Sequence, residues 1–169
     1  MPKLIKNHYI VDDSWTLVRL ADGDTAENMQ LPEGDIIVPL AVWQAKKPEL
    51  LKRPQRGVWL APDEEASAIA TDLDKLHVVA IDFPQFADGR GYSTAALLRT
   101  RFGWRGELRA IGDVLKDQLF YLSRVGFDAY AIREDRDIED AIKALNDFSE
   151  TYQSSTDEPL PLFRRRRAA

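Results

Sequence analysis

The sequence predicts an α/β fold with about five parallel strands alternating with helices. Five short apolar runs start about 20 to 30 residues apart, and each is followed by a segment in which apolar residues have helical spacing. Connections of this length fit right-handed crossovers between parallel strands. An open doubly wound sheet is the first choice. A partial β/α barrel stays as the alternative, because no sequence feature marks a switch in strand order.

Chain length and composition indicate one globular domain. The 169 residues are 44% hydrophobic and 30% charged, which suits a chain with a sizeable core. Residues 1–34 are expected to form a β-hairpin and a loop that pack on the main domain. Residues 35–153 are the α/β domain, and residues 154–169 are expected to be a flexible tail that carries Arg164–Arg167.

The predicted strands are short and rich in apolar and β-branched residues. In the N-terminal hairpin, Tyr9–Val11 precedes a turn at Asp12–Ser14, and Trp15–Leu20 forms the return strand. The strands of the main sheet are Ile36–Val38, Val58–Ala61, Val78–Ile81, Glu107–Ile111 and Ala129–Ile132.

Capping and breaking residues place the helices between these strands. Pro48 interrupts the first helix, and the second opens at Pro62 with acidic residues in its first turn. Ser93 and Asp113 are the expected N-caps of the next two helices. A last helix begins near Ile138, where apolar residues recur at helical spacing.

Composition narrows the functional classes. The absence of cysteine removes disulfides, thiolate ligands and thiol nucleophiles, and it fits a cytoplasmic location. No run of about eighteen apolar residues is present, so no contact with a membrane is expected. The 28 acidic residues outnumber the 23 basic ones, and four of the basic ones lie in the tail. Such an acidic body is a poor surface for nucleic acid, whose binding relies on neutralised phosphates.

One loop at the expected ligand-binding edge has the residues of a small-anion site. In either parallel architecture, ligands bind beyond the carboxyl ends of the strands. Asp88 and a glycine-containing loop follow the third strand. Two glycines allow the backbone to approach an anion closely, and an arginine and a serine offer hydrogen-bond donors. Its expected binding residues are Gly89, Arg90, Gly91, Tyr92 and Ser93. The alternative is a tight turn in which Arg90 pairs with a neighbouring acid.

Three carboxylates follow strand ends and are the catalytic candidates: Asp82, Asp88 and Asp113. If they converge, they suit a hard cation such as Mg²⁺, or one of them suits a general base. The structural alternative gives Asp113 the role of a helix cap and Asp88 that of a turn residue. His8 and His77 fit no metal-ligand spacing, so no metal centre is predicted.

Several stretches resemble a known family: VPLAVW, VWLAPDE, DFPQFADGRGYSTAALLR, RGELRAIGDVLKDQLFYLSRVGFDAY and LNDFSETYQ. They are similar to an uncharacterised bacterial family of unknown function, whose members are described as oxidoreductases involved in sulfite reduction. The resemblance runs from about residue 35 to residue 153. It implies an association with sulfite reductase and sulfate assimilation, and it supplies no catalytic residues.

The residues argue against an oxidoreductase that works alone. Sulfite reduction needs redox cofactors, yet the chain has no cysteine for an iron–sulfur cluster, no dinucleotide fingerprint and histidines badly placed for haem. No cofactor is evident.

Three hypotheses follow. The first is an accessory or binding protein of assimilatory sulfite or sulfate reduction. It would dock on sulfite reductase or another sulfur-assimilation protein and hold a small anion at Gly89–Gly91. The second is a non-redox enzyme that acts on a small anionic or phosphorylated substrate through the strand-end carboxylates. The third is a purely structural partner, for which the acidic surface and the arginine tail suffice.

Overall fold

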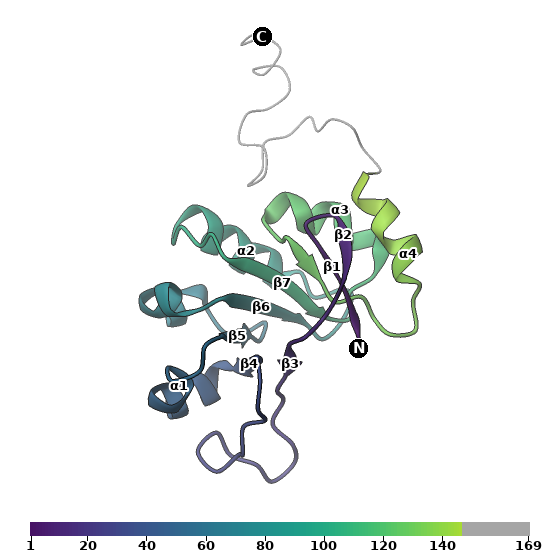
Figure 1. Ribbon diagram of the computed structural model, residues 1–169. Helices are drawn as coiled ribbons and strands as arrows, with labels where there is room; N and C mark the ends of the chain where they lie inside the picture. Colours follow the sequence, from purple (N-terminus) through teal and green to yellow (C-terminus); the bar gives the residue numbers. More distant parts are fainter. Residues whose placement is uncertain (147–169) are drawn as a thin grey trace.

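A computed structural model describes residues 1–146 as an eight-stranded sheet with helices between its strands (Figure 1). The strands are β1 (Lys3–Lys6), β2 (Tyr9–Asp12), β3 (Thr16–Leu17), β4 (Ile36–Pro39), β5 (Arg56–Leu60), β6 (Val78–Phe83), β7 (Glu107–Gly112) and β8 (Ala129–Tyr130). The helices are α1 (Leu40–Leu50), α2 (Arg90–Thr100), α3 (Lys116–Val125) and α4 (Ile138–Ala141), with 3-10 helices η1 (Ala66–Lys75) and η2 (Ile142–Asn146). The predicted tail, residues 154–169, lies outside the described residues.

Strands β4 to β8 are parallel, and they lie in the sheet in the order in which they occur along the chain. A doubly wound sheet requires a switch in strand order. The first-choice topology is therefore wrong, and the partial barrel describes the sheet better. Right-handed crossovers between sequential neighbours all pass on one side, which puts the helices on a single face.

The connection between β2 and β3 shows how strongly the sheet curls. These are its two edge strands, yet only Asp13, Ser14 and Trp15 join Asp12 to Thr16 (Figure 1). Four residue steps span at most about 14 Å, whereas the edges of a flat sheet of eight strands would lie about 33 Å apart. The sheet therefore curls into a half-barrel, and residues 13–15 bridge its open side.

An N-terminal hairpin joins the sheet beside β8, but it consists of β1 and β2, and the predicted pairing of residues 9–11 with residues 15–20 is wrong. β1 pairs with both β2 and β8 in antiparallel fashion. The predicted turn at residues 12–14 is wrong, because the chain reverses at Asn7 and His8, whose φ angles are 48° and 66°. Positive φ at both positions suits a two-residue hairpin turn, and asparagine tolerates it well. Residues after β2 continue to the opposite edge instead of returning.

The two faces of the sheet differ in what covers them. The larger core joins every helix to one face, with contributions from Trp43, Ile69, Leu98, Leu122 and Leu145. The smaller cluster lies on the other face and consists of Ile37, Val78, Ala80 and Ile111, with Trp15, Trp59 and Ala131 packed against it. This second face, called here the helix-free face, lines the inside of the half-barrel.

The starts of η1, α2 and α3 all differ from the predicted ones. The segment after β5 forms a 3-10 helix that begins at Ala66, whereas the predicted helix begins at Pro62. α3 begins at Lys116 with Leu115 as its N-cap, so the predicted capping role of Asp113 is wrong. The Gln118 side chain accepts a hydrogen bond from the Leu115 N–H at 3.0 Å and so takes up a helix-end donor.

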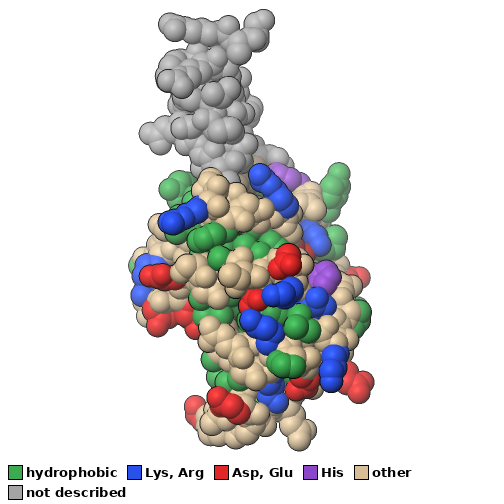
Figure 2. All heavy atoms as spheres, turned by 90° about the vertical axis from the view of Figure 1, so that its left-hand side faces the viewer, with side chains coloured by type: hydrophobic (Ala, Val, Ile, Leu, Met, Phe, Trp, Pro, Cys, Tyr) green, Lys and Arg blue, Asp and Glu red, His purple; other side chains and the backbone are tan. Residues whose placement is uncertain are grey.

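On the face shown in Figure 2, acidic and basic side chains are interspersed, so neither sign forms one continuous field there. Among residues 1–146, no helix combines the length and apolar character needed to cross a lipid bilayer.

Candidate functional site

The predicted anion-binding residues lie between β6 and the first turn of α2. Gly89 is the N-cap of α2 and Arg90 its first residue, so Ser93 lies in the first turn and its predicted capping role is wrong. The Asp88 carboxylate accepts hydrogen bonds from the Arg90 backbone N–H at 3.2 Å and from the Arg90 guanidinium at 3.0 and 2.7 Å. Hydrogen bonding to Arg90 lowers the pKa of Asp88. An internal carboxylate thus occupies the place that an external anion would take.

Gly91 and Tyr92 pack against the sheet. A Cβ atom at residue 91 would lie 2.7 Å from the Phe83 ring and 2.9 Å from Ile81, so glycine is needed for close contact between helix and strand. The Tyr92 ring lies 5.4 Å from the Phe83 ring and 5.1 Å from the Tyr121 ring, measured between centroids. Burial raises the pKa of Tyr92. Packing therefore accounts for both residues.

Each of the three candidate carboxylates has an arginine partner of its own. Asp82 accepts hydrogen bonds from Arg19 at 2.8 and 3.4 Å. Asp113 accepts one from Arg133 at 2.8 Å, and Asp88 is held by Arg90. The three do not share a partner. Each carboxylate is thus already engaged by a guanidinium group, which weighs against a role in proton transfer.

Asp82 also gains the structural role that its sequence context did not reveal. It is only 7% exposed on the helix-free face. Its partner Arg19 lies over the Trp59 ring at 4.8 Å, and the Trp59 indole N–H donates to the Val18 carbonyl at 2.9 Å. These contacts fix the segment after β3 against β5 and β6. Within residues 1–146, no group of three or more acidic or histidine side chains is arranged to hold a metal ion.

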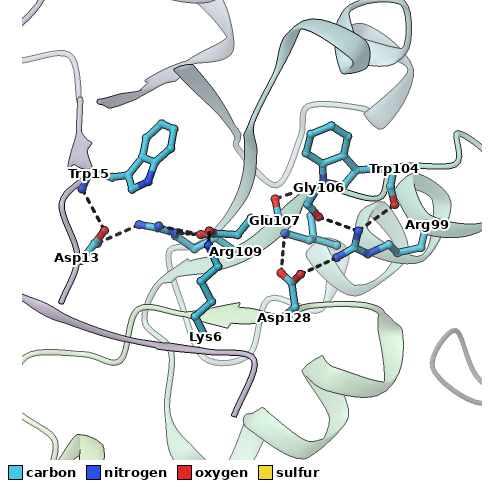
Figure 3. Close-up of polar contacts among 10 residues, drawn as sticks. Lys6, Asp13, Trp15, Arg99, Trp104, Gly106, Glu107, Arg109 and Asp128 are labelled. Carbon is cyan, nitrogen blue, oxygen red and sulfur yellow. Dashed lines mark hydrogen bonds and ion pairs between the residues drawn. The ribbon is translucent and has the colours of Figure 1, made fainter. Parts of the chain in front are cut away.

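A chain of four charged side chains crosses the helix-free face at β7 (Figure 3). Lys6 Nζ lies 2.7 Å from Glu107 Oε2, and Arg109 Nε donates to Glu107 Oε1 at 2.7 Å. Arg109 Nη1 also donates to Asp13 Oδ2 at 2.9 Å. Arg109 is only 3% exposed, and a buried charge is tolerated only when it is paired. The chain of ion pairs ties β1 and the bridging segment to β7.

A second network near β7 centres on Arg99 of α2 (Figure 3). Its guanidinium donates to the Gly126, Trp104 and Gly106 carbonyls at 2.8 to 2.9 Å and lies 3.4 Å from Asp128. Burial lowers the pKa of Arg99 and raises that of Asp128. Its partners are mostly backbone carbonyls, so this arginine holds loops in place.

The helix-free face contains an open cleft of about 930 Å³ at the carboxyl ends of β7 and β8. It is lined by the bridging segment, the end of β7 and the residues after β8. Its side chains include Asp13, Trp15, Leu17, Arg109, Ile111, Ala131, Arg133 and Arg136. This is the edge at which ligands bind in parallel α/β proteins. None of the predicted catalytic or anion-binding residues lines the cleft.

Sequence reasoning overlooked Glu107 and Arg109, although a signal was available. The two charges alternate with the apolar residues Leu108 and Ala110 in a predicted strand. A period of two puts both charges on one face of the sheet. Trp15 gave no comparable signal, because its place in the cleft depends on how the sheet curls.

Comparison with known proteins identifies a family whose function is unknown. The model of a family described as "Bacterial protein of unknown function (DUF934)" matches residues 57–163, more than half of the chain. No curated protein and no solved structure matched. The expectation of an uncharacterised bacterial family is confirmed. The chain belongs to the DUF934 family of bacterial proteins.

Proposed function

We propose that this protein is a cytoplasmic accessory protein of assimilatory sulfite or sulfate reduction, and that it binds a small oxyanion at Gly89–Ser93. The observation that carries the binding role is the Asp88–Arg90 pair at the start of α2. There an anionic group already uses the donors that a sulfite, sulfate or phosphate would need. The link to sulfur assimilation rests on the resemblance of the sequence stretches quoted above.

Binding is proposed to work by exchange of one anion for another. An incoming oxyanion would take over the Arg90 guanidinium and the Arg90 backbone N–H, and the Asp88 carboxylate would turn out to solvent. Asp88 is thus a competitor, which limits affinity. Asp88→Asn should bind sulfate more tightly because the competing charge is gone, whereas Arg90→Ala should bind it much more weakly.

Calorimetric titration of the full chain with sulfite, sulfate and phosphate tests the site. Saturable binding that is lost in Arg90→Ala and strengthened in Asp88→Asn is the expected result. Arg105→Ala is the matched control, because Arg105 is an exposed arginine just before β7, at the opposite ends of the parallel strands. Equal affinity in wild type and Arg90→Ala would contradict the proposal, as would no binding of any of the three anions.

The proposed partner needs a separate test. Affinity capture with the full chain is expected to recover sulfite reductase or another sulfur-assimilation protein. Deletion of the gene should slow growth on sulfate as the sole sulfur source and leave growth on a reduced sulfur source unchanged. Failure of both results would remove the pathway assignment, even if an anion binds at Arg90.

A further inference from the structure

The cleft on the helix-free face has the size and lining of a small-molecule site. Its volume of about 930 Å³ lies within the range of about 300 to 1,000 Å³ that is typical of ligand pockets. Ile37 and Ile111 form a buried apolar floor, and Leu17 adds an apolar side chain that is 37% exposed. Parallel sheets are usually covered on both faces, whereas within residues 1–146 only side chains and residues 13–19 cover this one.

Trp15 presents an unused hydrogen-bond donor in this cleft. The indole N–H groups of Trp43, Trp59 and Trp104 each donate to a carboxylate or a backbone carbonyl at 2.9 to 3.2 Å. Trp15 is half-buried and lines the cleft, yet its indole N–H has no acceptor within residues 1–146. A tryptophan N–H usually finds a partner when it is buried, whereas that of Trp15 is accessible from the cleft. A ligand with an acceptor at the edge of a planar ring would supply one.

Two cations on the cleft rim also have donors to spare. Arg136 makes one long ion pair, with Asp135 at 3.8 Å, and Lys3 pairs with no acid in the described part of the chain. Arg109 and Arg133 differ, because carboxylates hold their guanidinium groups at 2.6 to 2.9 Å. An oxyanion on a ligand would therefore be bound by Arg136 and Lys3 without breaking a short ion pair.

We propose that the cleft binds a planar aromatic anion of the nucleoside-monophosphate class. The aromatic ring lies on the apolar floor and accepts a hydrogen bond from the Trp15 indole N–H. The phosphate lies at Arg136 and Lys3. This site is separate from the loop at the start of α2, and it does not depend on the function proposed above.

The indole signals of the ¹⁵N-labelled full chain provide the first test. Trp15→Phe identifies the Trp15 signal and keeps an aromatic ring in the cleft. Adenosine 5′-monophosphate is expected to shift this signal saturably and to leave those of Trp43 and Trp104 in place. The proposal is overturned if millimolar nucleotide does not move the Trp15 signal, or if inorganic phosphate alone moves it equally.

Calorimetry with the same nucleotide tests whether the cations on the cleft rim contribute to binding. Arg136→Ala should weaken binding about tenfold or more, the loss typical of a charge-assisted hydrogen bond. Glu134→Gln should strengthen binding, because Glu134 is an acid on the same rim. Arg105→Ala should bind as wild type does. Unchanged affinity in Arg136→Ala, or loss of binding in Arg90→Ala alone, would overturn the assignment, and the latter result would move the nucleotide to the α2 loop.

Discussion

Asp72 is a carboxylate that stays ionised although it is only 4% exposed. Lys47 Nζ lies 2.6 Å from it, and the Trp43 indole N–H and Lys75 Nζ each donate to it at 2.9 Å. Burial raises the pKa of Asp72, but these hydrogen bonds outweigh burial and lower it from 3.8 to about 2. One residue of η1 is thereby joined to α1.

Replacing the Asp72 carboxylate tests whether its hydrogen bonds outweigh the cost of its burial. We expect Asp72→Asn to lower the free energy of unfolding by about 2 kcal/mol at neutral pH. The folded-state pKa is depressed, so the stabilisation is complete above the ordinary value of 3.8 and is lost as the pH falls toward 2. Urea unfolding of wild type and variant should give a difference that shrinks over this window. A difference that stays constant down to the lowest pH at which both proteins fold would contradict the role of the charge.

The two glycines of the predicted anion loop should respond differently to alanine. At Gly91 a Cβ atom would meet the buried Phe83 ring at 2.7 Å, and we expect Gly91→Ala to lower the free energy of unfolding by about 1 to 3 kcal/mol. At Gly89 the nearest atom lies 3.8 Å away on Tyr92, so Gly89→Ala is the matched control. Thermal unfolding of both variants shows whether glycine is needed at residue 91 for packing or for the approach of a ligand. If Gly91→Ala is as stable as wild type, packing is not the reason for this glycine.

At the scale of elements, β7 carries the ion pairs that hold the half-barrel together. Glu107 accepts from both Arg109 and Lys6, but Arg109 is 3% exposed and the Lys6 side chain is 41% exposed. Removing the buried partner leaves the Glu107 and Asp13 carboxylates poorly compensated. We therefore expect Arg109→Ala to destabilise the protein by about 3 to 5 kcal/mol.

Lys6→Ala provides the comparison, because it removes a charge from the same carboxylate at a more exposed position. Its expected cost is about 1 kcal/mol or less, the range of solvent-exposed ion pairs. Chemical denaturation of both variants measures the difference. Equal losses in the two variants would mean that burial does not set the strength of this network.

Individual elements were predictable where local signals were strong. The five strands of the main sheet were found because their apolar runs are short and well separated. The N-caps at Ser93 and Asp113 were predicted wrongly. In both cases a nearby residue competes for the helix end: Asp88 binds the first turn of α2, and Gln118 caps α3. The N-cap preference of a residue type alone does not show which of several neighbouring residues caps a helix.

At the scale of the whole molecule, strand order was the property that could not be predicted from the sequence. Strand–helix units fit a doubly wound sheet and a partial barrel equally well, because both use the same right-handed crossovers. The bridge at Asp13–Trp15 distinguishes them, but only when β2 and β3 are known to be opposite edges. The cleft could not be predicted for the same reason, since curvature brings Trp15 to Arg136.

The bridge itself should control local opening of the half-barrel. Asp13 anchors it through Arg109 and also accepts a hydrogen bond from the Trp15 backbone N–H at 3.1 Å. β3 has only two residues and both are exposed, whereas all six residues of β6 are buried at the centre of the sheet. Amides of β3 should therefore exchange through local opening, and those of β6 only through global unfolding.

We expect Asp13→Ala to speed hydrogen exchange at Thr16 and Val18 by about tenfold, as loss of about 1.4 kcal/mol of local stability would produce. Both amides donate across the β3–β4 pairing, at 2.9 Å to the Asp35 and Ile37 carbonyls. Asp12→Ala is the control, because Asp12 is exposed and makes no ion pair within residues 1–146. Faster exchange in β6 by the same factor would show that the bridge stabilises the whole sheet. Unchanged exchange in β3 would show that the half-barrel keeps its curvature without the Asp13–Arg109 pair.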